Sequence, residues 1–146
     1  MKGIMSVLAM FCLAASVHSQ SLKQPADVKN LTDTVMQEVS TENYTSGLDV
    51  LKQYSILSSA EIDTIESNLK AQMPKVEPSY GKIVGVEYIA QKQIGISLLN
   101  LTYLLKMERY ALRWTFSFYN GGAGWNLIFI DYNDKLQDMF SNSLSN

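Results

Sequence analysis

The feature that most limits the possible folds is an alternation of apolar and polar residues between residues 82 and 132. Alternation with a period of two is typical of β-strands that bury one face. Turn signals divide this region, and the strongest is the Asn-Gly-Gly sequence that begins at Asn120. The pattern predicts four strands, at residues 83–90, 95–106, 110–119 and 125–132. The connecting turns are expected at 91–94, 108–109 and 120–123.

The pairing of these strands can also be predicted, because a shift by one residue moves every side chain to the other face. A hairpin closed at 108–109 places Tyr103 opposite Trp114. Closure at 120–123 places Trp114 opposite Phe129, and closure at 91–94 places Val86 opposite Leu99. All these closures put large apolar residues on one face. We therefore expect an antiparallel meander with helices packed on that face.

Helical spacing of apolar residues precedes the sheet. It covers residues 28–39 and 44–54. A third stretch begins with an S-x-x-E capping box at Ser58, and Pro74 and Pro78 mark its end. A short helix or cap is expected at 134–140. The fold class predicted is α+β, with three N-terminal helices packed on a four-stranded antiparallel meander sheet and a short C-terminal helix.

Residues 1–19 have the pattern of a secretory signal peptide. Lys2 supplies a positive charge, residues 4–15 are almost entirely apolar, and small residues precede a cleavage site after Ser19. The apolar run is shorter than the roughly 20 residues that span a bilayer as a helix. We expect a secreted or periplasmic protein with no stable membrane span, whose residues 20–146 form one domain. A membrane anchor or a buried first helix is the alternative.

Cleavage after Ser19 would remove the only cysteine and the only histidine of the chain. The remaining domain could form no disulfide and would have no thiolate nucleophile and no imidazole base. The formal net charge of −2 does not predict a nucleic-acid partner. No D-x-D-x-D-G loop or tight acidic cluster occurs along the chain, so neither a metal site nor a cofactor is predicted.

A local pattern in the second half resembles a known family. It runs from Tyr80-Gly81-Lys82 and Gly85-x-Glu87-Tyr88 through Leu101-Thr102-Tyr103 to Arg113-Trp114-x-Phe116-x-Phe118-Tyr119, and ends with Gly124-Trp125 and Asp134-Lys135-Leu136-x-x-Met139-Phe140. This pattern resembles small secreted bacterial proteins of the NTF2-like (cystatin-like fold) superfamily that have no assigned activity. The resemblance implies a cone-shaped cavity between helices and sheet, and dimerisation through the outer face of the sheet. Catalytic members usually place Asp with His or Tyr inside the cone, and the mature chain lacks the His.

The predicted register directs five side chains into such a cavity. They are Tyr88, Tyr103, Trp114, Phe129 and Asp131. A carboxylate in an apolar cavity can have a raised pKa and act as a base, with Tyr103 as a hydrogen-bond donor. The alternative is that the aromatic residues belong to the core and that Asp131 bonds nearby backbone amides or a cation.

Apolar residues are also expected on the opposite face of the sheet. They are Leu98, Leu104, Ile128, Ile130 and Tyr132. These side chains would form the interface of a homodimer that packs sheet against sheet. The alternative is an ordinary scatter of apolar residues on a protein surface.

The sequence favours a non-enzymatic domain that binds a small apolar or aromatic ligand or a protein partner. An enzyme that uses Asp131 with Tyr103 for proton transfer or hydrolysis is the alternative, and a fully packed cone would leave only an interaction module. A cystatin-like inhibitor is a third hypothesis, because residues 91–95 half-match a Q-x-V-x-G loop.

In a eukaryotic secretory path, glycosylation would be expected at the N-x-T sites of Asn30, Asn43 and Asn100.

Overall fold

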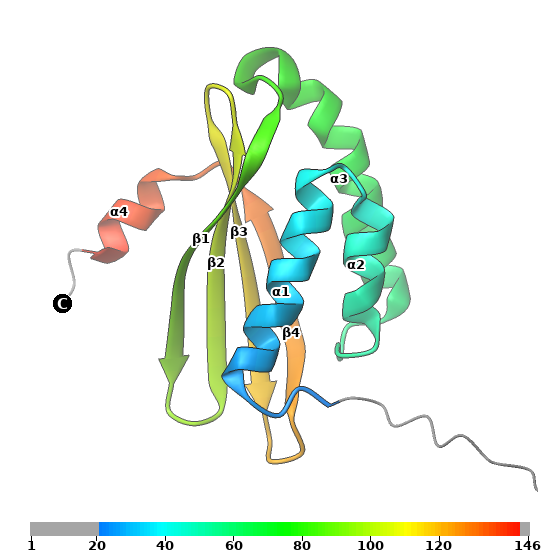
Figure 1. The fold of residues 1–146 in the computed structure, drawn as a ribbon, viewed down its shortest axis with the longest axis vertical. Helices are drawn as coiled ribbons and strands as arrows, with labels where there is room; N and C mark the ends of the chain where they lie inside the picture. The colour runs from blue at the N-terminus through cyan, green and yellow to red at the C-terminus, as the bar shows by residue number, and fades with distance from the viewer. Residues whose placement is uncertain (1–20, 144–146) are drawn as a thin grey trace, which may run out of the picture.

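The computed structural model describes residues 21–143, and the expected signal peptide at 1–19 therefore lies outside the described part. Three helices come first: α1 (Pro25–Ser40), α2 (Tyr44–Lys52) and α3 (Ser59–Tyr80). A sheet of four strands and a short helix follow: β1 (Ile83–Ile94), β2 (Leu98–Met107), β3 (Ala111–Asn120), β4 (Trp125–Asn133) and α4 (Gln137–Ser143). Figure 1 shows α1, α2 and α3 gathered on one side of the sheet.

The strands form an antiparallel meander in the order β1-β2-β3-β4. The predicted α+β class, with three helices before a four-stranded antiparallel sheet and a short helix after it, is confirmed. Within residues 21–143, no helix combines the length and the apolar character needed to cross a membrane.

The capping box expected at the start of α3 is present. The Ser58 hydroxyl accepts a hydrogen bond from the Glu61 N–H at 3.2 Å, and the Glu61 carboxylate accepts one from the Ser58 N–H at 2.7 Å. These bonds satisfy two backbone donors that the helix itself leaves unpaired. Pro74 and Pro78 do not end this helix as expected, because α3 continues through both of them to Tyr80.

The register of β2 against β3 follows the prediction. Tyr103 lies opposite Trp114, and the pairing continues without irregularity along both strands. The short turn at 108–109 leaves little freedom in how this hairpin closes.

The predicted register of β3 against β4 was wrong. Trp114 lies opposite Tyr132 rather than Phe129, and a bulge next to Phe118 leaves Ile128 without a partner across the strand pair. One extra residue in a strand reverses the facing of everything beyond it. Ile130 therefore packs against the core and is only 9% exposed, whereas Phe129 lies on the outer face and is 52% exposed.

The predicted turn at 91–94 was also wrong, because β1 continues to Ile94 and the chain turns at 95–97. Val86 therefore lies opposite Leu105 and not Leu99. Gly95 has a φ of 58°, a conformation that glycine adopts without steric cost. The extension of β1 is exposed on both faces, and this explains why its polar sequence resembles a loop.

The inner face of the sheet is closely packed against the helices. Trp114, Phe116 and Phe118 from β3 are fully buried, together with the apolar side of α1, for example Val35 and Val39. Tight packing of this kind leaves few voids larger than a water molecule. The centre of the expected cone is therefore filled by side chains.

The bulge divides the residues expected at a dimer interface. Ile130 and Tyr132 belong to the inner side, where the Tyr132 ring stacks on Trp114 with centroids 5.1 Å apart. Leu98 and Leu104 lie on the outer face, opposite Tyr119 and Arg113 respectively. The outer face is therefore less apolar in β4 than the sequence indicated.

The bulge can be tested with two neighbouring substitutions. We expect Ile130→Ala to lower the free energy of unfolding by about 2–5 kcal/mol, because it removes buried apolar volume. Phe129→Ala should change it by less than about 1 kcal/mol, because that ring is half in solvent. Urea unfolding followed by tryptophan fluorescence measures both. A larger loss for Phe129→Ala than for Ile130→Ala would support a ladder without the bulge.

Candidate functional site

The structure brings together three of the five residues expected in the cavity and separates the other two. Tyr88, Tyr103 and Trp114 lie on the inner face, and the rings of Tyr88 and Tyr103 meet edge to face at 5.4 Å. Phe129 and Asp131 lie on the outer face, opposite Ser117 and Thr115. Tyr103 and Trp114 are 2% and 0% exposed, so they offer no surface to a ligand.

The Tyr103 hydroxyl is fully engaged within the protein. It donates a hydrogen bond to Asp33 at 2.8 Å and lies 2.8 Å from the hydroxyl of Thr32. Asp33 also pairs with Lys29 at 2.6 Å, and the Lys29 ammonium lies 4.4 Å from the centre of the Tyr88 ring. Burial, with Asp33 adding to it, raises the pKa of Tyr103 well above its usual value. Tyr103 therefore ties α1 to β2.

Asp131 cannot act together with Tyr103, because the two side chains lie on opposite faces of the sheet. Its carboxylate accepts a hydrogen bond from the Asn133 side chain at 2.6 Å. The acid–base pair considered for an enzyme is thus not assembled here. The partners that Tyr103 does have, Thr32 and Asp33 on α1, were missed because sequence spacing does not show which part of a helix lies over a strand.

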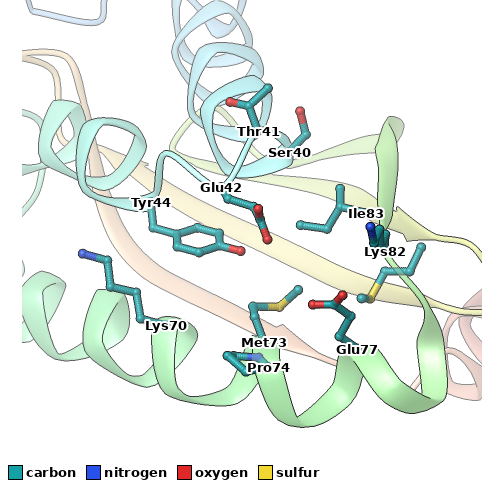
Figure 2. Close-up of a pocket in the computed structure, with 11 residues that line it drawn as sticks. Ser40, Thr41, Glu42, Tyr44, Lys70, Met73, Pro74, Glu77, Lys82 and Ile83 are labelled. Atoms are coloured by element: carbon teal, nitrogen blue, oxygen red, sulfur yellow. The ribbon is translucent and has the colours of Figure 1, made fainter.

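A cleft of about 480 Å³ opens at another place, between the end of α1, the start of α2, the second half of α3 and the base of β1 (Figure 2). Its apolar walls come from Met73, Pro74, Ile83 and Met107. Its polar groups come mainly from the turn between α1 and α2 and from α3. The sequence reading gave no indication of this cleft, because its walls are separated by up to 67 positions along the chain.

Tyr44 provides the most informative group in this cleft. The residue is 6% exposed, and its hydroxyl has no hydrogen-bond partner within the part of the chain that the structure describes. Figure 2 shows this hydroxyl directed toward the middle of the cleft. A buried hydroxyl without a hydrogen-bond partner lowers the free energy of unfolding by about 1–3 kcal/mol. Burial raises the pKa of Tyr44 to about 12, and the charges of Glu42 and Glu77 act in the same direction.

Glu42 occupies a backbone position that normally favours glycine. Its φ is 64°, its N–H donates to Val39 O, and the next N–H donates to Glu38 O, each at 3.0 Å. These bonds form the helix-terminating motif in which a left-handed residue follows the helix. A residue with a Cβ costs about 1–2 kcal/mol in this conformation. Figure 2 shows the Glu42 side chain pointing into the cleft.

Only one of the charged side chains that line the cleft, that of Lys70, forms an ion pair within the described residues. The Lys70 ammonium is held by the Glu66 carboxylate at 2.5 Å and by the Thr45 hydroxyl at 2.9 Å. Glu42, Glu77 and Lys82 also line the cleft, and none of them forms an ion pair with another residue between 21 and 143. Two carboxylates, one ammonium and one buried hydroxyl of the lining therefore have no charged or hydrogen-bonding partner from the described fold.

Two prolines inside α3 remove N–H donors from the helix that forms one side of the cleft. Pro74 has no N–H, so the carbonyl of Lys70 lacks the donor that would normally lie four residues later in the helix. Pro78 has the same effect on the carbonyl of Pro74. Lys70 and Pro74 both line the cleft.

A second group of charged residues lies on α2 and α3, outside the cleft. Asp49, Asp63 and Glu66 each place a carboxylate oxygen within 4.8 Å of the others, a cluster that the sequence reading did not find. The Lys52 ammonium lies 2.5 Å and 2.6 Å from the first two. These contacts raise the pKa of Lys52, and the lysine provides the positive charge that a metal ion would otherwise supply.

Comparisons with protein-family models, with curated proteins and with solved structures found no match to this chain. Its function must therefore be inferred from the geometry of the chain itself.

Two tyrosines test whether the cleft is less satisfied than the core. We expect Tyr44→Phe to raise the free energy of unfolding by about 1 kcal/mol, because it removes a buried hydroxyl that has no partner. Tyr103→Phe should lower it by about 1–2 kcal/mol, because Thr32 and Asp33 each lose a hydrogen bond. Chemical denaturation of both variants measures the difference. A destabilising Tyr44→Phe would show that its hydroxyl is satisfied in the fold.

Proposed function

We propose that this chain is a secreted or periplasmic NTF2-like domain that binds a small ligand without catalysing a reaction on it. The proposed site is the cleft between the α1–α2 turn, α3 and the base of β1. The observation that carries the proposal is the hydroxyl of Tyr44, which is buried, has no partner among residues 21–143 and is directed into the cleft.

The size and the lining of the cleft support a small organic ligand. Sites for small molecules commonly measure about 300–1,000 Å³ and combine apolar walls with a few polar groups. The cleft measures about 480 Å³. The side chains of Met73, Ile83 and Met107 offer apolar surface, and Tyr44 with two glutamates offers polar contacts. This site differs from the aromatic interior expected from the sequence, which is packed.

The chemistry of the cleft favours binding over catalysis. A general base works best with a pKa near the operating pH. The pKa of Tyr44 is raised to about 12, so this hydroxyl stays protonated at neutral pH and donates a hydrogen bond rather than taking a proton. The acid–base pair considered on the sheet, Asp131 with Tyr103, is split between two faces.

Two further parts of the proposal rest on the sequence pattern. Export is supported by the charge, the apolar run and the small-residue site within residues 1–19. An NTF2-like relationship is supported by the local sequence pattern and by three helices that precede an antiparallel meander.

Methionine methyl groups provide a direct test of the site. We expect compounds from a fragment library to shift the ¹³C-methyl NMR signals of Met73 and Met107, which line the cleft. Met36, which is fully buried in the core, should not respond. Tyr44→Phe should weaken the binding of fragments that contact its hydroxyl by about 2- to 10-fold, which corresponds to one hydrogen bond. A library that shifts neither Met73 nor Met107 would contradict the proposal.

The outer face of the sheet supports a second proposal, a homodimer. The Nε of Arg113 is buried there without a hydrogen-bond partner in the described residues, and Asp131 lies on the same face without an ion pair in that range. In a two-fold dimer each arginine can meet the aspartate of the other copy. Leu98, Tyr119 and Phe129 add exposed apolar surface on this face.

The dimer is tested by molar mass in solution. We expect light scattering coupled to size exclusion to give a dimer for the unmodified protein and a monomer for Phe129→Lys. Ile96→Lys is the matched control, because Ile96 lies in the β1–β2 turn and is more exposed still. A monomeric unmodified protein, or loss of the dimer in Ile96→Lys alone, would contradict this interface.

A further inference from the structure

We propose that the ligand of the cleft is an organic cation, with a primary ammonium group at the polar wall and an aliphatic chain along the methionine walls. This inference rests on the proposed function, because it assigns a chemical class to the ligand of the same site. It begins from the groups that the described fold leaves without partners.

Most of the unpartnered polar groups around the cleft can accept hydrogen bonds, and the ammonium of Lys82 is the exception. Glu42 and Glu77 present carboxylates that form no ion pair between residues 21 and 143, and the oxygen of Tyr44 is free of partners there. A primary ammonium has three N–H donors and no acceptor. It is therefore complementary to the two carboxylates and the Tyr44 oxygen, which outnumber the one ammonium of the described lining that has no ion pair, that of Lys82.

The prolines of α3 extend the same pattern. The carbonyls of Lys70 and Pro74 lack their usual helical donors, and both residues belong to the lining of the cleft. Proline inside a helix normally costs stability without a local return. Here the two prolines stand in the part of α3 that lines the cleft, and each removes one N–H donor from that helix.

The electrostatic potential in the cleft also favours a cation. The charged groups that act on the Tyr44 hydroxyl are Glu42 and Glu77, and both make loss of its proton harder, which indicates negative potential at that point. The nearby Lys70 is neutralised by Glu66 at 2.5 Å. Lys82 also lines the cleft, but it is not among the charges that act on the Tyr44 hydroxyl.

The lining distinguishes an organic cation from a metal ion. Calcium takes 6–8 oxygen ligands, and magnesium requires near-ideal octahedral geometry. The side chains of this wall that carry partner-free oxygens are Glu42, Tyr44 and Glu77, while Met73, Ile83 and Met107 make much of the remainder apolar. An alkyl chain attached to the ammonium would cover this apolar surface, which a hydrated metal ion would leave exposed to water.

The left-handed backbone conformation of Glu42 supports a role for its side chain in the cleft. Glycine would be favoured at a φ of 64°, yet a glutamate stands there and points into the cleft. Strained residues of this kind occur preferentially at ligand sites.

The test compares three probes of the same length: n-hexylammonium, hexan-1-ol and hexanoate. Each is titrated into the protein as purified after export. The methyl signals of Met73 and Met107 are the readout, and the methyl signal of Met36 is the internal control. We expect n-hexylammonium to bind at least about tenfold more tightly than hexan-1-ol, as a charge-assisted hydrogen bond predicts. Hexanoate should bind most weakly, and the affinity for n-hexylammonium should fall as salt is added.

The outcomes separate the two proposals. If hexan-1-ol or hexanoate binds as tightly as n-hexylammonium and shifts Met73 and Met107, the ammonium class is wrong and the cleft remains a binding site. If no probe shifts either methionine at any accessible concentration, while fragments of other chemistry also fail, both proposals are wrong.

Variants identify the groups responsible. We expect Glu42→Gln and Glu77→Gln each to weaken n-hexylammonium binding by about 3- to 10-fold while leaving the affinity for hexan-1-ol unchanged. Glu87→Gln is the matched control, because Glu87 is exposed on β1 outside the cleft. Glu42→Gly should weaken binding and also raise the melting temperature, so that a folding defect cannot explain the loss. Equal affinity for n-hexylammonium in Glu42→Gln, Glu77→Gln and Glu87→Gln would overturn the proposal.

Discussion

The contact between Tyr103 and α1 determines where the helices lie on the sheet, and the cleft depends on that placement. The tyrosine hydroxyl is buried, and its hydrogen bonds to Thr32 and Asp33 remove the cost of taking it out of water. Because these partners lie near the middle of α1, the helix is held across β1 and β2 and its last turn reaches the base of β1. The turn that follows then carries Glu42 and Tyr44 over α3. A shift of α1 along the sheet would break the hydrogen bond between Tyr103 and Asp33 and would also change the cleft.

Tyr44 and Tyr103 lie in two parts of one small domain and differ in the hydrogen bonding of their hydroxyl groups. Both are nearly inaccessible to solvent, but only Tyr103 has partners for its hydroxyl among the described residues. The strained φ of Glu42 and the two prolines inside α3 belong to the same cleft as Tyr44. Each of these features lowers stability when considered alone. Their concentration around one cavity, while the core is well packed, is the pattern expected where a site has been kept for binding rather than for folding.

The parts of the fold that the sequence predicts are those controlled by neighbouring residues. The β2–β3 hairpin follows from a short turn and strict alternation, and the start of α3 follows from Ser58 and Glu61. The bulge at Ile128 leaves no local signal, because an extra apolar residue in an apolar strand does not alter the composition. The polar end of β1 resembles a loop, since neither of its faces is covered. Tyr44 fits the apolar stripe of α2 equally well as a core residue, and its role depends on residues of α3 and β1 that are 26 or more positions away.

The same bulge determines which residues are available on the two faces of the sheet. Without Ile128 as an extra residue, Phe129 and Asp131 would face the helices, and Ile130 would face outward. The bulge instead places an aliphatic side chain and a tyrosine inward, and it moves an aromatic ring and a carboxylate to the face that carries Arg113. The cleft lies on the helical side, so a partner on the outer face would not cover it. The proposed ligand site and the proposed dimer interface therefore do not compete for the same surface, because successive residues of a strand point to opposite faces.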